Sequence, residues 1–170
     1  TFGLGWFGAG ISWVHVSIAD FGGMPLIASV LMMFLLSAYL ALFPAFSFYF
    51  AKRWVKPALL PLLLPAIWFI AEWLRSWLLS GFPWLSLGYS QLDSPLSGWL
   101  PVLGETGMTW LLMTMVSALA VATLSKRFLQ AVAITGSITI AALLLNSVSW
   151  VEPQQPVSIG MAQGNIAQSL

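Results

Sequence analysis

The stretch SGFPWLSLGYSQ, residues 80–91, interrupts a chain that is otherwise a series of hydrophobic segments. It holds two glycines, a proline, two large aromatic residues that carry polar atoms, three serines and a glutamine, and Glu72 and Arg75 precede it within an apolar helix. Polar and charged groups are costly at membrane depth. A segment that keeps them beside helix-breaking and aromatic residues is therefore expected to form a functional site where lipid meets water.

The composition places the chain among integral membrane proteins. Of its 170 residues, 59% are hydrophobic and only 6% are charged, and the mean hydropathy is +0.92, far from the values of a soluble domain. The net charge of +1 argues against a nucleic-acid partner. With no cysteine and a single histidine, His15, the sequence predicts no disulfide, no metal site and no cofactor.

Hydrophobic segments of the length needed to cross a bilayer, about 20 residues, occur at four places. They are residues 24–50, 58–80, 107–124 and 128–148. Residues 2–19 form a fifth candidate, in which four glycines weaken the helix but permit close packing in lipid. The expected fold is an all-α polytopic membrane helix bundle of about five transmembrane helices within residues 1–150.

Basic residues gather in two of the predicted turns and set the orientation. They are Lys52, Arg53 and Lys56 in one turn, and Lys126 and Arg127 in the other. By the positive-inside rule both turns face the cytoplasm. The outer face then holds residues 20–23, the connection 81–106 and everything after residue 150. We expect the connection to be an interfacial or re-entrant loop.

After the last span the sequence changes character. Residues 151–156 form a polar linker with two prolines, which cannot continue a helix. Val157, Ile159 and Met161 then alternate with small or polar residues, which predicts a strand, and residues 163–165 read as a turn or strand end. Residues 157–170 are therefore expected to begin a soluble domain. Because no basic segment precedes the first apolar stretch, we interpret the chain as an internal fragment of a longer protein.

Glu72 and Arg75 lie on one helix face and admit two interpretations. A structural ion pair would offset the cost of burying both charges and fix helix packing. Alternatively, Arg75 lies close enough to the outer interface to hold a lipid phosphate, for which a planar guanidinium is well suited. The tryptophans near them are similarly ambiguous, because an aromatic belt is common at membrane interfaces.

Three other polar residues, His15, Glu105 and Asp93, are not assigned to the site. His15, on an apolar stretch, is expected to be packed or interfacial rather than catalytic. Glu105, ahead of the predicted span 107–124, is expected to cap a helix N-terminus, where a carboxylate is favourable. Asp93 has no assigned role.

Several short motifs in this order resemble the apolipoprotein N-acyltransferase family. They are FGLGWF at 2–7, EWLR at 72–75, GFPW at 81–84, LGYSQ at 87–91, PL at 95–96 and QGNI at 163–166. The resemblance implies a multi-pass protein of the bacterial inner membrane that carries a nitrilase-like αββα domain on the periplasmic side. It also implies transfer of an acyl chain from a phospholipid to the N-terminal diacylglyceryl-cysteine of a lipoprotein.

The family's catalytic Glu, Lys and Cys do not map onto these residues and are expected beyond Leu170. We therefore expect no catalytic residue and no metal site here, and instead a surface that positions the phospholipid donor, the lipoprotein acceptor and surrounding membrane lipids. The predicted substrate-binding residues are Glu72, Arg75, Phe82, Pro83, Trp84, Tyr89 and Gln91. Two alternatives stay open, namely a transporter or channel subunit and a purely structural membrane anchor.

Overall fold

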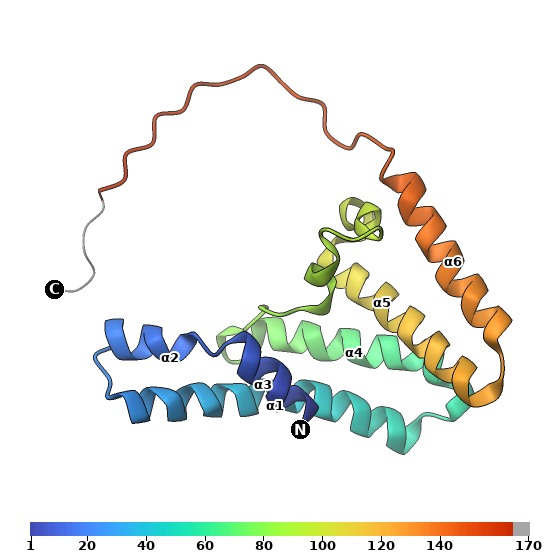
Figure 1. Cartoon of the computed structure of the whole chain (residues 1–170), viewed down its shortest axis with the longest axis horizontal. Coiled ribbons are helices and arrows are strands. Elements are labelled where there is room, and N and C mark those ends of the chain that lie inside the picture. Colours follow the sequence, from blue (N-terminus) through green and yellow to red (C-terminus); the bar gives the residue numbers. More distant parts are fainter. Residues whose placement is uncertain (165–170) are drawn as a thin grey trace.

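The structure, a computed structural model, describes residues 1–164 apart from the side chains of 124 and 125, and all its regular elements are helices (Figure 1). The α-helices are α1 (Phe2–Gly10), α2 (Val14–Val16), α3 (Leu26–Trp54), α4 (Leu60–Trp77), α5 (Leu100–Ser125) and α6 (Phe128–Leu145). The shorter elements are a π-helix, η1 (Ser17–Phe21), and the 3₁₀ helices η2 (Pro57–Leu59), η3 (Leu78–Ser80), η4 (Leu87–Gln91) and η5 (Ser97–Trp99). No strand occurs within the described residues.

Within residues 1–164, four helical segments are long and apolar enough to cross a membrane. They are Leu26–Trp54, Pro57–Ser80, Ser97–Thr123 and Phe128–Leu145. The first predicted span is not one straight helix, because Phe2–Gly10 and Val14–Phe21 meet at an angle of 57°. If this bent pair counts as one span, the bundle has five, which confirms the expected fold class.

Small residues let the helices approach one another closely. α1 packs on α3, α3 on α4, α4 on α5 and α5 on α6. At the first contact a Cβ added to Gly3 would lie 2.9 Å from the Ala41 Cβ, and Ala118, Ala122 and Ala131 form a buried cluster at α5 and α6. Close packing of this kind replaces the hydrophobic driving force that is missing between helices in lipid.

The two basic turns lie at the same end of the bundle (Figure 1). α3 carries Lys52 and Arg53 in its last turn, and α6 begins beside Arg127. Arg127 and Pro57, from the two different turns, line one cavity. This arrangement agrees with the prediction that both turns face one side of the membrane.

The predicted boundary of the connection 81–106 is wrong at its end. α5 begins at Leu100, so the last seven residues of the predicted loop belong to this helix. The discrepancy arises at Gly104, whose backbone (φ 66°, ψ −175°) breaks the helix internally, and only glycine adopts that conformation without strain. The remaining connection contains two short 3₁₀ helices, η4 and η5.

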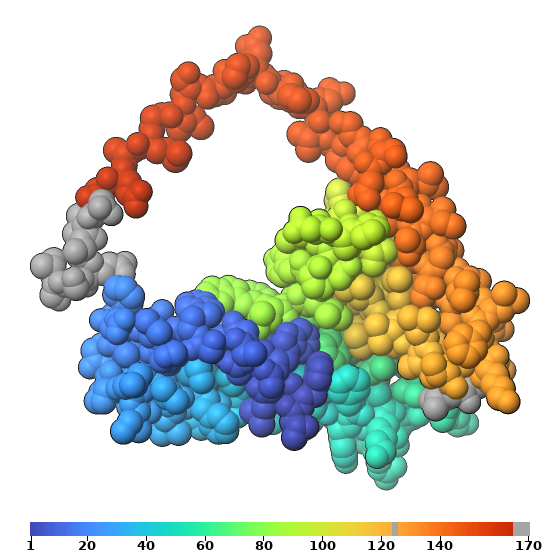
Figure 2. Space-filling view, in the orientation of Figure 1, coloured from blue at the N-terminus to red at the C-terminus, as the bar shows by residue number. Residues whose placement is uncertain are grey.

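Beyond α6 the chain leaves the bundle. Residues 151–164 are exposed and contain neither helix nor strand, and they arch away from the helices with open space beneath them (Figure 2). The strand expected within 157–170 and the soluble domain that it would begin stay predictions. Asn165 and the residues after it lie outside the described residues.

Candidate functional site

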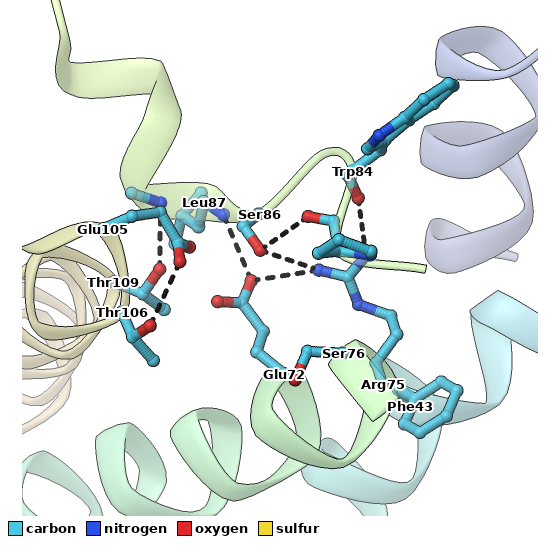
Figure 3. A network of polar contacts seen from close by, with 12 residues as sticks. Phe43, Glu72, Arg75, Ser76, Trp84, Ser86, Leu87, Glu105, Thr106 and Thr109 are labelled. Carbon is cyan, nitrogen blue, oxygen red and sulfur yellow. Dashed lines mark hydrogen bonds and ion pairs between the residues drawn. The ribbon is translucent and has the colours of Figure 1, made fainter. Parts of the chain in front are cut away.

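Arg75 holds the connection against the end of α4. Its side chain is only 2% exposed, although Arg75 lies in the last turn of α4. Its Nη1 donates hydrogen bonds to the carbonyl oxygens of Phe82 (2.8 Å) and Trp84 (2.5 Å), and its Nη2 donates to the Ser86 hydroxyl (3.2 Å) (Figure 3). Charge-assisted bonds of this kind are stronger than neutral ones. One guanidinium therefore fixes the path of five consecutive residues.

Glu72 completes this arrangement one helical turn earlier. Its Oε1 lies 3.8 Å from Arg75 Nη2 and accepts a hydrogen bond from the Leu87 backbone N–H at 3.1 Å (Figure 3). The Trp68 indole and the Thr109 hydroxyl lie close to the carboxylate, but Oε2 makes no hydrogen bond of ordinary geometry to any described residue. The pair thus holds both ends of the segment 82–87 onto α4.

The connection also docks on α5. The Gly88 N–H donates a hydrogen bond to the Thr109 hydroxyl at 2.9 Å, and Thr109 is completely buried. A Cβ at Gly88 would collide with the Glu105 carbonyl oxygen, so only glycine permits this close approach. Glu105 lies just after the break in α5 and accepts a hydrogen bond from the Thr106 hydroxyl. Because the helix resumes after Gly104, Glu105 is at the start of the helical part that follows, and its expected capping role stays a prediction.

The far end of the connection is attached to α6. The Trp99 indole N–H donates to the Ile138 carbonyl at 3.0 Å, and the Asn146 side-chain amide donates to the Pro95 carbonyl at 3.3 Å. Gly98 lies so close to α6 that a Cβ there would collide with the Ala142 carbonyl oxygen. The connection is therefore bound to α4, α5 and α6.

Three residues that follow α4 have strained backbone conformations. Leu79, Ser80 and Leu85 have positive φ angles of 52°, 75° and 60°, which are unfavourable for residues with a Cβ. Such strain persists only where surrounding contacts impose it. The bonds of Glu72 and Arg75 provide those contacts.

The predicted site residues divide into two groups. Glu72 and Arg75 are buried and Phe82 and Gln91 are half-buried, whereas Pro83 is exposed and Trp84 and Tyr89 are 52% and 53% exposed. The Trp84 ring stacks on Trp13 with centroids 5.2 Å apart, and Gln91 donates a hydrogen bond to its neighbour Ser90. Arg75 connects Glu72, Phe82 and Trp84 directly, and Pro83 through the Ser86 hydroxyl. Tyr89 and Gln91 lie beyond this network.

An apolar groove of about 1170 Å³ begins beside Tyr89. α1, α4 and α5 line it with side chains that include Trp6, Trp68 and Met113. Ser117, on the α5 wall, is 2% exposed and its hydroxyl has no hydrogen-bond partner among the described residues. Ser86, Tyr89 and Ser90 also line the groove, so its polar side chains lie mainly at the connection. The apolar remainder can accommodate an extended hydrocarbon chain.

The sequence analysis missed two residues of this site. The Phe7 ring lies beneath the Arg75 guanidinium, 5.3 Å from its carbon to the ring centroid. Phe7 belongs to the motif FGLGWF, but nothing in that motif indicates a contact with Arg75. Thr109 offered a weak signal, because a polar residue inside an apolar span usually has a local partner. The His15 ring contacts the Ser12 carbonyl, in keeping with an interfacial histidine.

The polar groups of the site are a guanidinium, a carboxylate, hydroxyls and backbone amides. Among the residues that the structure describes, no three His, Asp or Glu side chains gather closely enough to hold a metal ion. The available chemistry is hydrogen bonding, aromatic contact and burial of apolar surface. These properties suit binding and orientation.

The sequence of this chain is similar to those of known proteins. The family model described as the apolipoprotein N-acyltransferase N-terminal domain matches residues 1–119. The chain is 45% identical to an apolipoprotein N-acyltransferase of Vibrio vulnificus and covers 34% of it, with 100% of this chain aligned. It is 44% identical to the enzyme of Vibrio cholerae, and the alignment covers 99% of this chain and 34% of that relative. It is 40% identical to the enzyme of Nitrosomonas europaea, where the alignment covers 100% of this chain and 35% of the relative. The chain thus spans about a third of the length of these relatives, and it belongs to the apolipoprotein N-acyltransferase family.

Proposed function

We propose that this chain is the membrane portion of a phospholipid:apolipoprotein N-acyltransferase and that it positions the lipid substrates. In this proposal the intact enzyme transfers an acyl chain from a phospholipid to the N-terminal diacylglyceryl-cysteine of a lipoprotein. The chain contains no cysteine, so the acyl-accepting thiol that the family uses lies outside these residues. Orientation of the reactants before chemistry can supply a large part of catalysis.

The observation that carries the proposal is the fixed, exposed aromatic segment 82–91. Its backbone is bonded to Arg75 and Glu72, while its Trp84 and Tyr89 side chains are half exposed. Rigid aromatic side chains at a membrane interface contact both lipid tails and polar head groups. The groove beside Tyr89 would receive an acyl chain.

Within the predicted set of binding residues, we assign two kinds of role. Phe82, Pro83, Trp84, Tyr89 and Gln91 would contact substrate, and Glu72 and Arg75 would hold them in place. Direct binding of a lipid phosphate by Arg75 stays a prediction. The burial of its guanidinium and its bonds to three groups of the connection favour the positioning role.

The proposed setting is the bacterial inner membrane, with the connection and the C-terminal segment in the periplasm. The gathering of basic turns at the opposite end supports this orientation. Residues 157–170 would then lead into a nitrilase-like domain on the same side as the aromatic segment.

Truncation of the exposed aromatic side chains tests the proposal. In the intact enzyme we expect the double variant Trp84→Ala, Tyr89→Ala to raise the KM for phospholipid by roughly thirtyfold, since well-placed interfacial aromatics each contribute about 1 kcal/mol. The measurement is acyl transfer to a diacylglyceryl lipopeptide. Phe128→Ala, which removes an exposed aromatic side chain at the opposite end of the bundle, is the matched control.

The alternatives predict different outcomes of this experiment. If the chain is only an anchor, the double variant will transfer acyl groups with an unchanged KM. If it is part of a transporter or channel, the intact protein will show no acyl transfer even before substitution.

A further inference from the structure

A second groove lies between α3 and α4 and is separate from the site described above. Its volume is about 530 Å³. Aromatic and aliphatic side chains line it, among them Tyr39, Phe46, Phe50, Trp54 and Ile70. The lining runs from Tyr39, whose hydroxyl donates to the Leu78 carbonyl near the outer end, to Trp54 at the last residue of α3.

The groove is long enough for a complete acyl chain. Fifteen residues separate Tyr39 from Trp54 on one helix, which corresponds to a rise of about 22 Å. One leaflet of a bilayer contributes about 15 Å of hydrocarbon. A chain that enters at the Trp54 end therefore finds apolar walls along its whole length.

Uncompensated positive charge marks the Trp54 end. Lys52, Arg53 and Lys56 flank Trp54 and Val55 in sequence, and all three are exposed. Within the part of the chain that the structure describes, their side chains make no ion pair. The sequence also has no carboxylate between residues 21 and 71. The basic side chains at this end are therefore free to bind an anionic group.

From this charge and this groove we infer that α3 and α4 bind an anionic diacyl phospholipid of the leaflet at the basic end, with its phosphate at Arg53 and Lys56 and an acyl chain between the helices. Basic pockets between helices on the cytoplasmic side recognise such head groups. Trp54, which is 66% exposed and stacks on Phe50 with centroids 4.7 Å apart, lies at the depth where indoles meet head groups. This lipid is a structural ligand, distinct from the acyl donor.

Native mass spectrometry of the intact protein tests the inference. The protein is taken from nanodiscs that contain phosphatidylglycerol and phosphatidylcholine with identical acyl chains, and the retained lipids are counted. We expect preferential retention of phosphatidylglycerol. In Arg53→Gln, Lys56→Gln the preference should fall by roughly fivefold for each charge removed, whereas the charge-matched Lys126→Gln, Arg127→Gln should keep it.

A steric variant tests whether lipid retention depends on the groove as well as on the basic residues. Leu42→Trp places bulk in the groove wall and should abolish retention. Leu31→Trp, on an equally lipid-facing part of α3 outside the groove, should not. The inference is overturned if the wild-type protein retains no phosphatidylglycerol, which would also be the result if a protein segment filled the groove. It is equally overturned if both charge variants lose the preference alike, or if Leu42→Trp retains the lipid.

Discussion

Replacement of Arg75 by methionine is expected to destabilise the intact protein by about 3–5 kcal/mol, the usual cost of leaving one partner of a buried ion pair alone. The substitution removes the donors to Phe82, Trp84 and Ser86 and leaves the Glu72 carboxylate without its cation. We expect a lower unfolding temperature in detergent and new protease cleavage within residues 82–91. Arg127→Met, at an exposed turn, should change neither.

Further substitutions separate the two roles considered for Arg75. Arg75→Met combined with Glu72→Leu should recover part of the lost stability, because the unpaired charge is removed as well. Arg75→Lys should lose protection of the segment 82–91, since an ammonium cannot reproduce the planar fork of donors. If Arg75→Lys instead keeps stability and protease protection but no longer binds phospholipid, the guanidinium is a substrate ligand and the positioning role is wrong.

Substitution of Gly88 by alanine is expected to detach the connection from α5. The added Cβ would collide with the Glu105 carbonyl oxygen and lie 2.9 Å from its carbon and 3.2 Å from the Thr109 hydroxyl oxygen. Backbone atoms of a packed helix cannot move aside cheaply, so overpacking should cost about 1–3 kcal/mol. Thermal unfolding and acyl transfer should both decline, because the Gly88–Thr109 hydrogen bond lies beside the Glu72 contact with Leu87.

Gly136 provides the matched control for this change. It lies inside α6, and a Cβ there would meet no atom within 4 Å. Gly136→Ala should leave activity unchanged and stabilise the helix by up to about 1 kcal/mol. Equal behaviour of the two alanine variants would show that Gly88 does not lie against α5.

Hydropathy and charge predicted the architecture well because a bilayer imposes length and polarity directly on sequence. Two departures have local causes. Residues 2–19 bend at residues 11–13 instead of forming one helix, and α5 begins before the polar residues Glu105 and Thr106. In both places glycines obscure where a helix begins or breaks, since their effect depends on packing that the sequence does not reveal.

The sequence indicated a polar segment beside a charged pair, but it could not indicate which atoms these groups contact. A charged pair inside an apolar helix indicated Glu72 and Arg75, and helix breakers indicated the segment after them. Which atoms the guanidinium binds depends on the path of residues 82–86, and that path includes strained backbone at Leu85. The contacts that Phe7 and Thr109 make come from distant elements, so the sequence near each residue does not reveal its partner.

Side-specific labelling of single cysteines tests the central claim most directly, namely that the aromatic connection and the C-terminal segment share the face opposite the basic turns. The chain contributes no thiol of its own, so once any cysteine outside these residues is replaced by serine, Asp93→Cys, Gln163→Cys, Lys56→Cys and Lys126→Cys can each be introduced separately into the intact protein. A membrane-impermeant maleimide added from the periplasmic side should label positions 93 and 163 and leave 56 and 126 unlabelled. Labelling of 93 and 163 from opposite sides of the membrane would contradict the account.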